Sequence, residues 1–288
     1  MKCISAECHV CITVKKGSIC NPAWIITFFE RHINSNLEKP INQYYILFIM
    51  KKIYLFVVLA LISVLSFSSC EKIEGHGPII SEIRNRTGFE GLRVSVCGQI
   101  NFQVSPLYKV EVLAQANILD ELETKVDGAA LEIKWSHPLR VRNCEDITIN
   151  ISGPKLRFIS NSGSSDIQVL GFVSHPTLEL TSSGSGSINI DQIEISDELE
   201  AKISGSGQIF IASGLADRST LYVSGSGEMD LSQVETAINN SHISGSGNVT
   251  VKVSEYLEAH ISGSGDVYYY GRPRIETKIS GSGRVKGL

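Results

Sequence analysis

The sequence predicts an all-β protein folded as a parallel β-helix, a solenoid with about 18–21 residues in each coil. The first observation is an internal repeat, because Ser-Gly-Ser-Gly recurs with start-to-start spacings of 21, 20, 20, 18 and 18 residues. The six copies begin at Ser183, Ser204, Ser224, Ser244, Ser262 and Ser280, and a degenerate copy begins 21 residues earlier at Ser162. The second observation is that apolar and polar residues alternate on both sides of each copy, as in a strand with one buried face.

Each repeat is interpreted as a strand, a Ser-Gly-Ser-Gly corner, a second strand and a return loop. A unit of about 20 residues cannot bury its own apolar row, whereas stacked coils cover one another. Glycine at the corner allows a positive φ and close stacking, and we expect serines at equal height to hydrogen-bond in a ladder. The residues predicted to point inward are Ile203, Ile209, Val223, Ile243, Val249 and Ile261.

Composition and charge exclude several classes of protein. Residues 1–69 carry about +4 and residues 70–288 about −8, and this acidic main body argues against nucleic acid as a partner. A hydrophobic content of 42% is enough for a packed core and excludes wholesale disorder. Aromatic residues make up only 7% of the chain, so the core is predicted to be mainly aliphatic.

The first elements in order are a leader and an anchor. Residues 50–70 read as a lipoprotein signal peptide, with Lys51 and Lys52, an apolar run of 13 residues, and small residues before Cys70. We expect Cys70 to receive lipid and hold the chain on a membrane. Residues 1–49 are then a spurious N-terminal extension, with Met50 as the true start. The alternatives are an ordinary signal peptide or anchor helix for residues 50–70 and, for residues 1–49, a zinc site around the Cys8-x-x-Cys11 pair.

The remaining elements are a tether and the repeat domain. Residues 71–88, with Gly75, Gly77 and Pro78, are predicted to be a tether. Residues 89–288 form the β-helix domain, and alternation over residues 89–151 predicts its less regular opening coils. Cys97 and Cys144 either pair in an oxidising compartment or stay as isolated thiols.

The chain resembles the putative auto-transporter adhesin head GIN domain family over about residues 89–288. The family's Gly-Ile-Asn is Gln99-Ile100-Asn101 here, a departure at one position. The other matching segments are residues 89–96, Tyr108–Val112, Thr124–Gly128, Leu131–Ile133 and the Ser-Gly-Ser-Gly repeats. The resemblance implies a right-handed β-helix in a lipoprotein or secreted protein of a Gram-negative bacterium. It implies no catalytic residues.

These observations favour a cell-envelope lipoprotein, expected at the outer membrane, whose adhesin-like domain binds a surface ligand or partner without catalysis. The alternatives are a structural envelope-maintenance lipoprotein and a polysaccharide-active β-helix enzyme. The enzyme would need clustered acids, but Glu200 stands beside Lys202 and Glu258 beside His260, as on a solvated face. No catalytic residue, metal site or cofactor is predicted.

The sequence also predicts a binding site and partners. The aromatic and basic cluster of Tyr268, Tyr270, Arg272 and Arg274 is the candidate ligand site, where a ring could stack on a sugar. The partners expected are a membrane through Cys70, a surface glycan or protein, and a second copy joined end to end.

Overall fold

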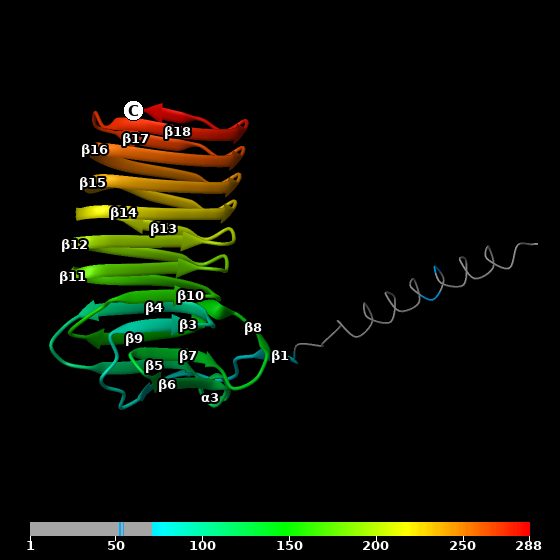
Figure 1. Cartoon of the computed structure of the whole chain (residues 1–288). Coiled ribbons are helices and arrows are strands. Elements are labelled where there is room, and N and C mark those ends of the chain that lie inside the picture. Colours follow the sequence, from blue (N-terminus) through cyan, green and yellow to red (C-terminus); the bar gives the residue numbers. More distant parts are fainter. Residues whose placement is uncertain (1–51, 53, 55–70) are drawn as a thin grey trace, which may run out of the picture. The chain divides into compact units, whose positions relative to one another are not determined.

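The computed structural model describes residues 71–288, together with positions 52 and 54. Residues 71–288 form one compact unit, a nearly all-β solenoid of about 6 turns whose coils stack in parallel, as the sequence predicts (Figure 1). The leader, Cys70 and the residues before them, apart from positions 52 and 54, lie outside the described residues. No helix among the described residues is long and apolar enough to cross a membrane.

Parallel strands build the stack. They are β3 (Gly91–Val94), β4 (Cys97–Val104), β7 (Ala130–Trp135), β9 (Thr148–Gly153), β10 (Phe158–Asn161), β11 (Ser164–Ser182), β12 (Ser187–Ile203), β13 (Gln208–Ile211), β14 (Gly214–Gly225), β15 (Glu228–Gly245), β16 (Asn248–Gly263), β17 (Val267–Tyr270), β18 (Arg274–Gly281) and β19 (Val285–Gly287). The long strands bend around more than one face of a coil, so that β15 pairs with β14, β13 and β16.

The Ser-Gly-Ser-Gly corners stack through glycine and main-chain hydrogen bonds. Gly245 has a φ of +140°, and a Cβ added there would lie 2.4 Å from the carbonyl oxygen of Gly225 in the preceding coil. The backbone N–H of Ser246 donates to the same oxygen over 2.8 Å, and the next two corners repeat this contact. Glycine is therefore required for the coils to approach. The expected ladder is formed by the main chain, and the hydroxyls of these serines take no part in it.

The core is a column of inward-pointing side chains. All six residues predicted to point inward are buried, and each is at most 2% exposed. Register places Ile243 of β15 between Val223 of β14 and Ile261 of β16. Buried polar residues interrupt the aliphatic column, and in one such layer the Asn239 amide donates to Ser219 Oγ and Ser241 Oγ donates to Asn239 Oδ1, both over 2.7 Å. These hydrogen bonds satisfy the buried groups, so the polar layer is tolerated.

The opening coils differ from the sequence prediction in their order along the stack. β3 pairs with both β7 and β10, and β4 pairs with both β9 and β11. Residues 91–104 therefore lie between a coil from residues 130–153 and one from residues 158–170, although they precede both in the chain. Alternation predicts that a segment is a strand, but it does not say which strand lies next to it.

Antiparallel strands cover the first end of the stack, so residues 89–151 do not form coils throughout. The segments there are β2 (Ile79–Ile83), β5 (Lys109–Gln115), the short helix α3 (Ala116–Leu119) and β6 (Leu122–Asp127). β5 runs antiparallel to β9 and to β2, and β6 runs antiparallel to β7. This arrangement pairs the end of the sheet that a parallel solenoid would leave open.

The prediction of a tether over residues 71–88 is wrong in part. β1 (Glu71–Glu74) pairs in parallel with β8 (Leu139–Arg142), and β2 pairs with β5. Arg84, which follows β2, donates from its guanidinium to the carbonyl oxygen of Leu119 over 3.0 Å. Gly77 and Pro78 form the turn between β1 and β2. Glycine and proline indicate a break in strand structure, and here the break separates two docked strands.

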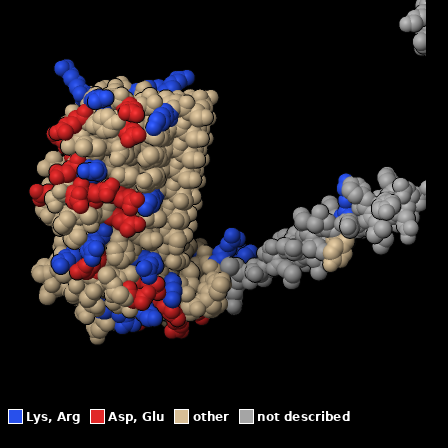
Figure 2. Space-filling view, viewed as in Figure 1, with Lys and Arg blue, Asp and Glu red and all other residues tan. Residues whose placement is uncertain are grey.

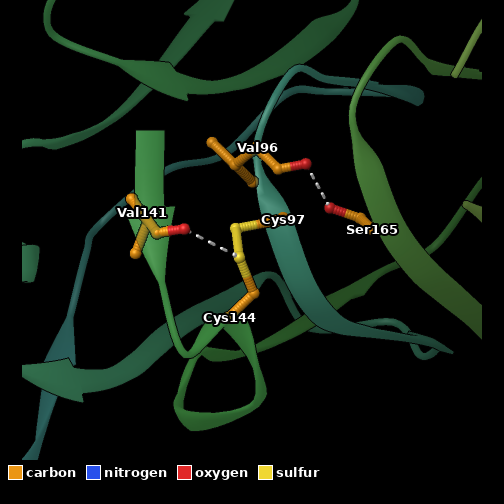
Figure 3. Close-up of a disulfide and its surroundings, with 5 residues drawn as sticks. All are labelled: Val96, Cys97, Val141, Cys144 and Ser165. Atoms are coloured by element: carbon orange, nitrogen blue, oxygen red, sulfur yellow. Dashed lines mark hydrogen bonds between the residues drawn. A yellow bond between two sulfur atoms is a disulfide. The ribbon is translucent and has the colours of Figure 1, made fainter. Parts of the chain in front are cut away.

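A disulfide joins Cys97 to Cys144, which resolves the two alternatives left open by the sequence. Cys97 begins β4, and Cys144 begins the 3₁₀ helix η1 (Cys144–Asp146) just before β9 (Figure 3). Beside the bridge, Ser165 Oγ donates to the carbonyl oxygen of Val96 over 2.8 Å (Figure 3). The bridge spans 47 residues and holds together two coils that are consecutive in space and distant in sequence.

Candidate functional site

An outward column of aromatic and basic side chains follows the strands that lead into the corners. Its members are Lys202, Tyr222, His242, His260 and Lys278, each two residues before the first serine of a corner. Register pairs each member with the next across β12, β14, β15, β16 and β18. Alternation sends these side chains outward because the neighbouring residues, such as Ile243, point into the core. We call this set the ring column.

The rings of the column stack on one another. The Tyr222 and His242 rings are nearly parallel, with an interplanar angle of 11° and centroids 4.9 Å apart. The His242 and His260 rings are also 4.9 Å apart and are tilted by 46°. Lys202 places its ammonium 5.8 Å from the centroid of the Tyr222 ring, within the range of a cation–π contact. The ring faces are thus turned along the stack, and their edges face outward.

Carboxylates beside the column pair with its basic groups. Lys202 Nζ lies 2.6 Å from Glu200, and this hydrogen bond raises the pKa of the lysine. His260 Nε2 lies 2.7 Å from Glu258, and the same contact lowers the pKa of that carboxyl. Burial lowers the pKa of His242, with His260 adding to the effect and Glu258 opposing it. At neutral pH His242 is therefore an uncharged ring within the stack.

A groove of about 450 Å³ runs beside the ring column across four coils. One wall is formed by Tyr222, His242, His260 and Lys278. The other wall is a row of corner serines, Ser224, Ser244, Ser262 and Ser280, and the strand residues between the two rows form the floor. The four serines are exposed, and their hydroxyls have no partner among the described residues. We call this feature the column groove.

The structure separates the residues that the sequence suggested as a ligand site. Tyr268 lies outward on β17, donates its hydroxyl to Asp266 over 3.1 Å, and has the Lys286 ammonium 5.1 Å from its ring centroid. Tyr270 ends the same strand and is 40% exposed, and Gly271 then turns the chain. Arg272 lies in this turn and is exposed.

Arg274 begins β18, where its register partner is Tyr256. Among the described residues no hydrogen bond or ring contact joins either arginine to Tyr268 or Tyr270. The four residues therefore do not form one assembled site in this structure. A ligand-binding role for them stays a prediction.

The ring column was missed by reasoning from the sequence, although the signal is present there. His242 and His260 look scattered in the linear sequence, because their spacing fits no metal site. Aligned on the repeats, both fall two residues before a corner, as do Tyr222 and Lys202. Within residues 71–288 no group of three or more His, Cys, Asp or Glu side chains is placed to hold a metal ion.

Comparison with known proteins now adds the family. Residues 88–273 match the model of a domain described as "Putative auto-transporter adhesin, head GIN domain", which is well over half of the chain. The chain belongs to this family. No curated protein matches the chain.

Solved structures share the fold of this family member. A putative adhesin from Bacteroides fragilis is 22% identical, with a TM-score of 0.71, and the match covers 75% of this chain and 100% of the other. A putative adhesin from Parabacteroides distasonis is 21% identical, with a TM-score of 0.62, over 76% and 100%. A protein from the same species described as a putative lipid binding protein gives the same four values. At these identities the likeness establishes the fold alone.

Proposed function

We propose that this family member is an envelope lipoprotein, anchored by lipid on Cys70, whose solenoid binds a surface ligand without catalysing a reaction. The observation that carries the proposal is the column groove, an open, linear site that the register of the repeats builds on an outward face. Enzymes that act on small molecules use concave, largely closed pockets. An open groove lined by the same positions in successive coils suits repeated weak contacts with a surface.

Two further observations support this proposal. The Cys97–Cys144 bridge is of the kind that persists in oxidising compartments such as the periplasm or the cell surface. The matched family, the solved structure from Bacteroides fragilis and one of the two from Parabacteroides distasonis carry the description of putative adhesins. The lipoprotein signal read from residues 50–70 supports the further proposal that the protein lies at the outer membrane.

The anchor and the exposure of the domain are tested together on cells that produce the full chain. Cys70→Ala is expected to move the protein from the membrane fraction to the soluble fraction, because stable anchoring requires lipid chains. Protease added to intact cells is expected to remove the wild-type domain. Unchanged membrane fractionation of Cys70→Ala would overturn the anchor. Protection from protease until the outer membrane is opened would overturn the surface role and favour the structural envelope lipoprotein.

A further inference from the structure

We infer that the column groove binds an uncharged polysaccharide chain lying along the axis of the stack. The inference rests on the proposed function and adds to it the ligand class and the site. Three features of the groove support it: its repetition, the chemistry of its two walls, and the pairing of the charges around it.

The groove repeats with the coils. The same three positions of each coil line it from Tyr222 to Ser280, so that its polar groups recur at the rise of one coil, about 4.8 Å. A row of equivalent groups at constant spacing suits a ligand that is itself a chain of equivalent units. A compact small molecule would occupy one coil and leave the others unused. An extended polymer can contact all four.

The two walls differ in the same way as the faces and the rim of a sugar ring. Tyr222, His242 and His260 form a wall that is mainly carbon, which Lys278 continues. The floor is strand main chain, because the side chains of Val223, Ile243 and Ile261 point into the core. The opposite wall presents four serine hydroxyls, each able to donate one hydrogen bond and to accept others. A pyranose unit presents apolar C–H groups on its faces and hydroxyls around its rim. Such a unit can therefore place its C–H face against the outward ring edges of the ring column while its rim hydroxyls hydrogen-bond to the serines.

The charges near the groove favour an uncharged ligand. Lys202 is paired with Glu200, and His260 is paired with Glu258, so neither presents an unpaired cation. Lys278 is the one lysine that lines the groove. Recognition of phosphate or carboxylate groups uses clustered, convergent cations, which a single lysine does not supply. The corner strip consists of serine and glycine, and Figure 2 shows a broad edge of the stack without charged side chains.

Affinity electrophoresis of the full chain in detergent tests the inference. The gels contain laminarin, arabinoxylan, galactomannan or dextran as uncharged polysaccharides, with polygalacturonate as the acidic comparison. We expect at least one uncharged polysaccharide to retard the wild-type protein. Ser244→Phe, which fills the groove from an exposed position, is expected to lower that affinity at least about tenfold. Ser246→Phe is the matched control, because Ser246 is equally exposed in the same corner and does not line the groove.

A second pair of variants removes a wall instead of filling the groove. Tyr222→Ala is expected to weaken retardation, and Tyr256→Ala, which changes an outward tyrosine outside the groove, is expected to leave it unchanged. Equal binding by Ser244→Phe and Ser246→Phe would overturn the site. Retardation by polygalacturonate alone, or by none of the polysaccharides, would overturn the ligand class.

Phospholipid vesicles separate the ligand class from the proposed function. Binding to phosphatidylcholine or phosphatidylglycerol vesicles that Ser244→Phe abolishes, without retardation by any polysaccharide, would show that the groove takes lipid. That result would overturn this inference and leave a surface-binding role standing. Failure of the proposed function is read separately, from protease protection on intact cells.

Discussion

Gly245 shows how one side chain limits the distance between coils. Its φ of +140° is unfavourable for other residues, and an added Cβ would meet the Gly225 carbonyl oxygen at 2.4 Å. We predict that Gly245→Ala destabilises the domain by about 1–3 kcal/mol, because both the backbone conformation and the contact are strained. The measurement is the urea midpoint of unfolding. Exposed Ser246→Ala is the control and should stay within about 0.5 kcal/mol. Equal midpoints for the two variants would contradict the corner geometry.

His242 gives the domain a pH-dependent stability. Burial holds its pKa below the ordinary value of 6.5 in the folded protein, so the unfolded chain takes up the proton first as pH falls. The contribution is present above that ordinary value and is lost as pH falls from it toward the lowered folded pKa. The groups facing His242 are Tyr222 on β14 and His260 and Glu258 on β16.

The prediction concerns the difference between wild type and His242→Asn. Wild type should lose more unfolding free energy between about pH 7.5 and about pH 5 than the variant, because asparagine does not titrate. Urea titrations at the two pH values measure this difference. Both proteins retain Glu258 and His260, so the difference between them reports the loss of the His242 side chain. An equal loss in the two proteins would show that His242 does not carry the dependence.

At the scale of elements, the disulfide holds the irregular end of the stack. β4 and β9 are neighbours in space, although 43 residues separate the end of β4 from the start of β9. We predict that the double variant Cys97→Ala/Cys144→Ala loses about 2–4 kcal/mol, because the unfolded chain is no longer constrained by a closed loop. Thermal unfolding with and without reductant measures the effect. Reductant should lower the midpoint of wild type and leave the double variant unchanged, and a wild-type midpoint insensitive to reductant would contradict the role.

The same elements show what sequence reasoning can and cannot reach. Strands β11 to β19 were predictable, because each Ser-Gly-Ser-Gly corner marks a coil and the alternation beside it marks the buried face. The position of β3 and β4 between later coils was not, since a period of two is the same whatever strand lies alongside. The docking of β1 and β2 was hidden for a similar reason. Gly77 and Pro78 predict a turn but not the partners of the strands on either side.

The candidate site was within reach of the sequence only after alignment of the repeats. The equivalence of His242 and His260 is visible only when each is numbered relative to the corner that follows it. The groove itself depends on the direction of side chains and on the hydroxyls that the main-chain ladder leaves unpaired. Both follow from the three-dimensional structure and not from the sequence pattern. The residues of the cluster around Tyr268 are close in sequence, but a turn at Gly271 separates the two tyrosines on β17 from Arg274 on β18.

At the scale of the whole molecule, the two ends of the stack differ. Antiparallel strands cover the first end, whereas all residues of β18 are exposed, including the core positions Ile275 and Ile279. β18 pairs with β16 and with no other described strand. An exposed strand with an apolar row is a template for pairing with another chain. A second copy of this chain is the occupant we expect.

End-to-end association is therefore predicted to depend on concentration. Light scattering of the wild-type protein should show monomers in dilute solution and dimers when concentrated. Ile279→Lys places a charge at the exposed strand, as proteins do to block such pairing, and should shift the equilibrium toward monomer. Lys286→Ala, which removes a charge from β19 at the same end of the stack, is the comparison and should not shift the equilibrium toward monomer. A dimer that Ile279→Lys leaves intact would place the interface elsewhere.

Adherence of living cells tests the column groove and the surface position at the same time. The direct measurement compares cells producing wild-type protein, Ser244→Phe or Ser246→Phe at equal surface levels, and counts the cells retained on a surface coated with the polysaccharide that retards the wild-type protein. The account predicts that Ser244→Phe reduces retention to the level of cells without the protein, while Ser246→Phe retains the wild-type level. Wild-type retention by Ser244→Phe cells would contradict it.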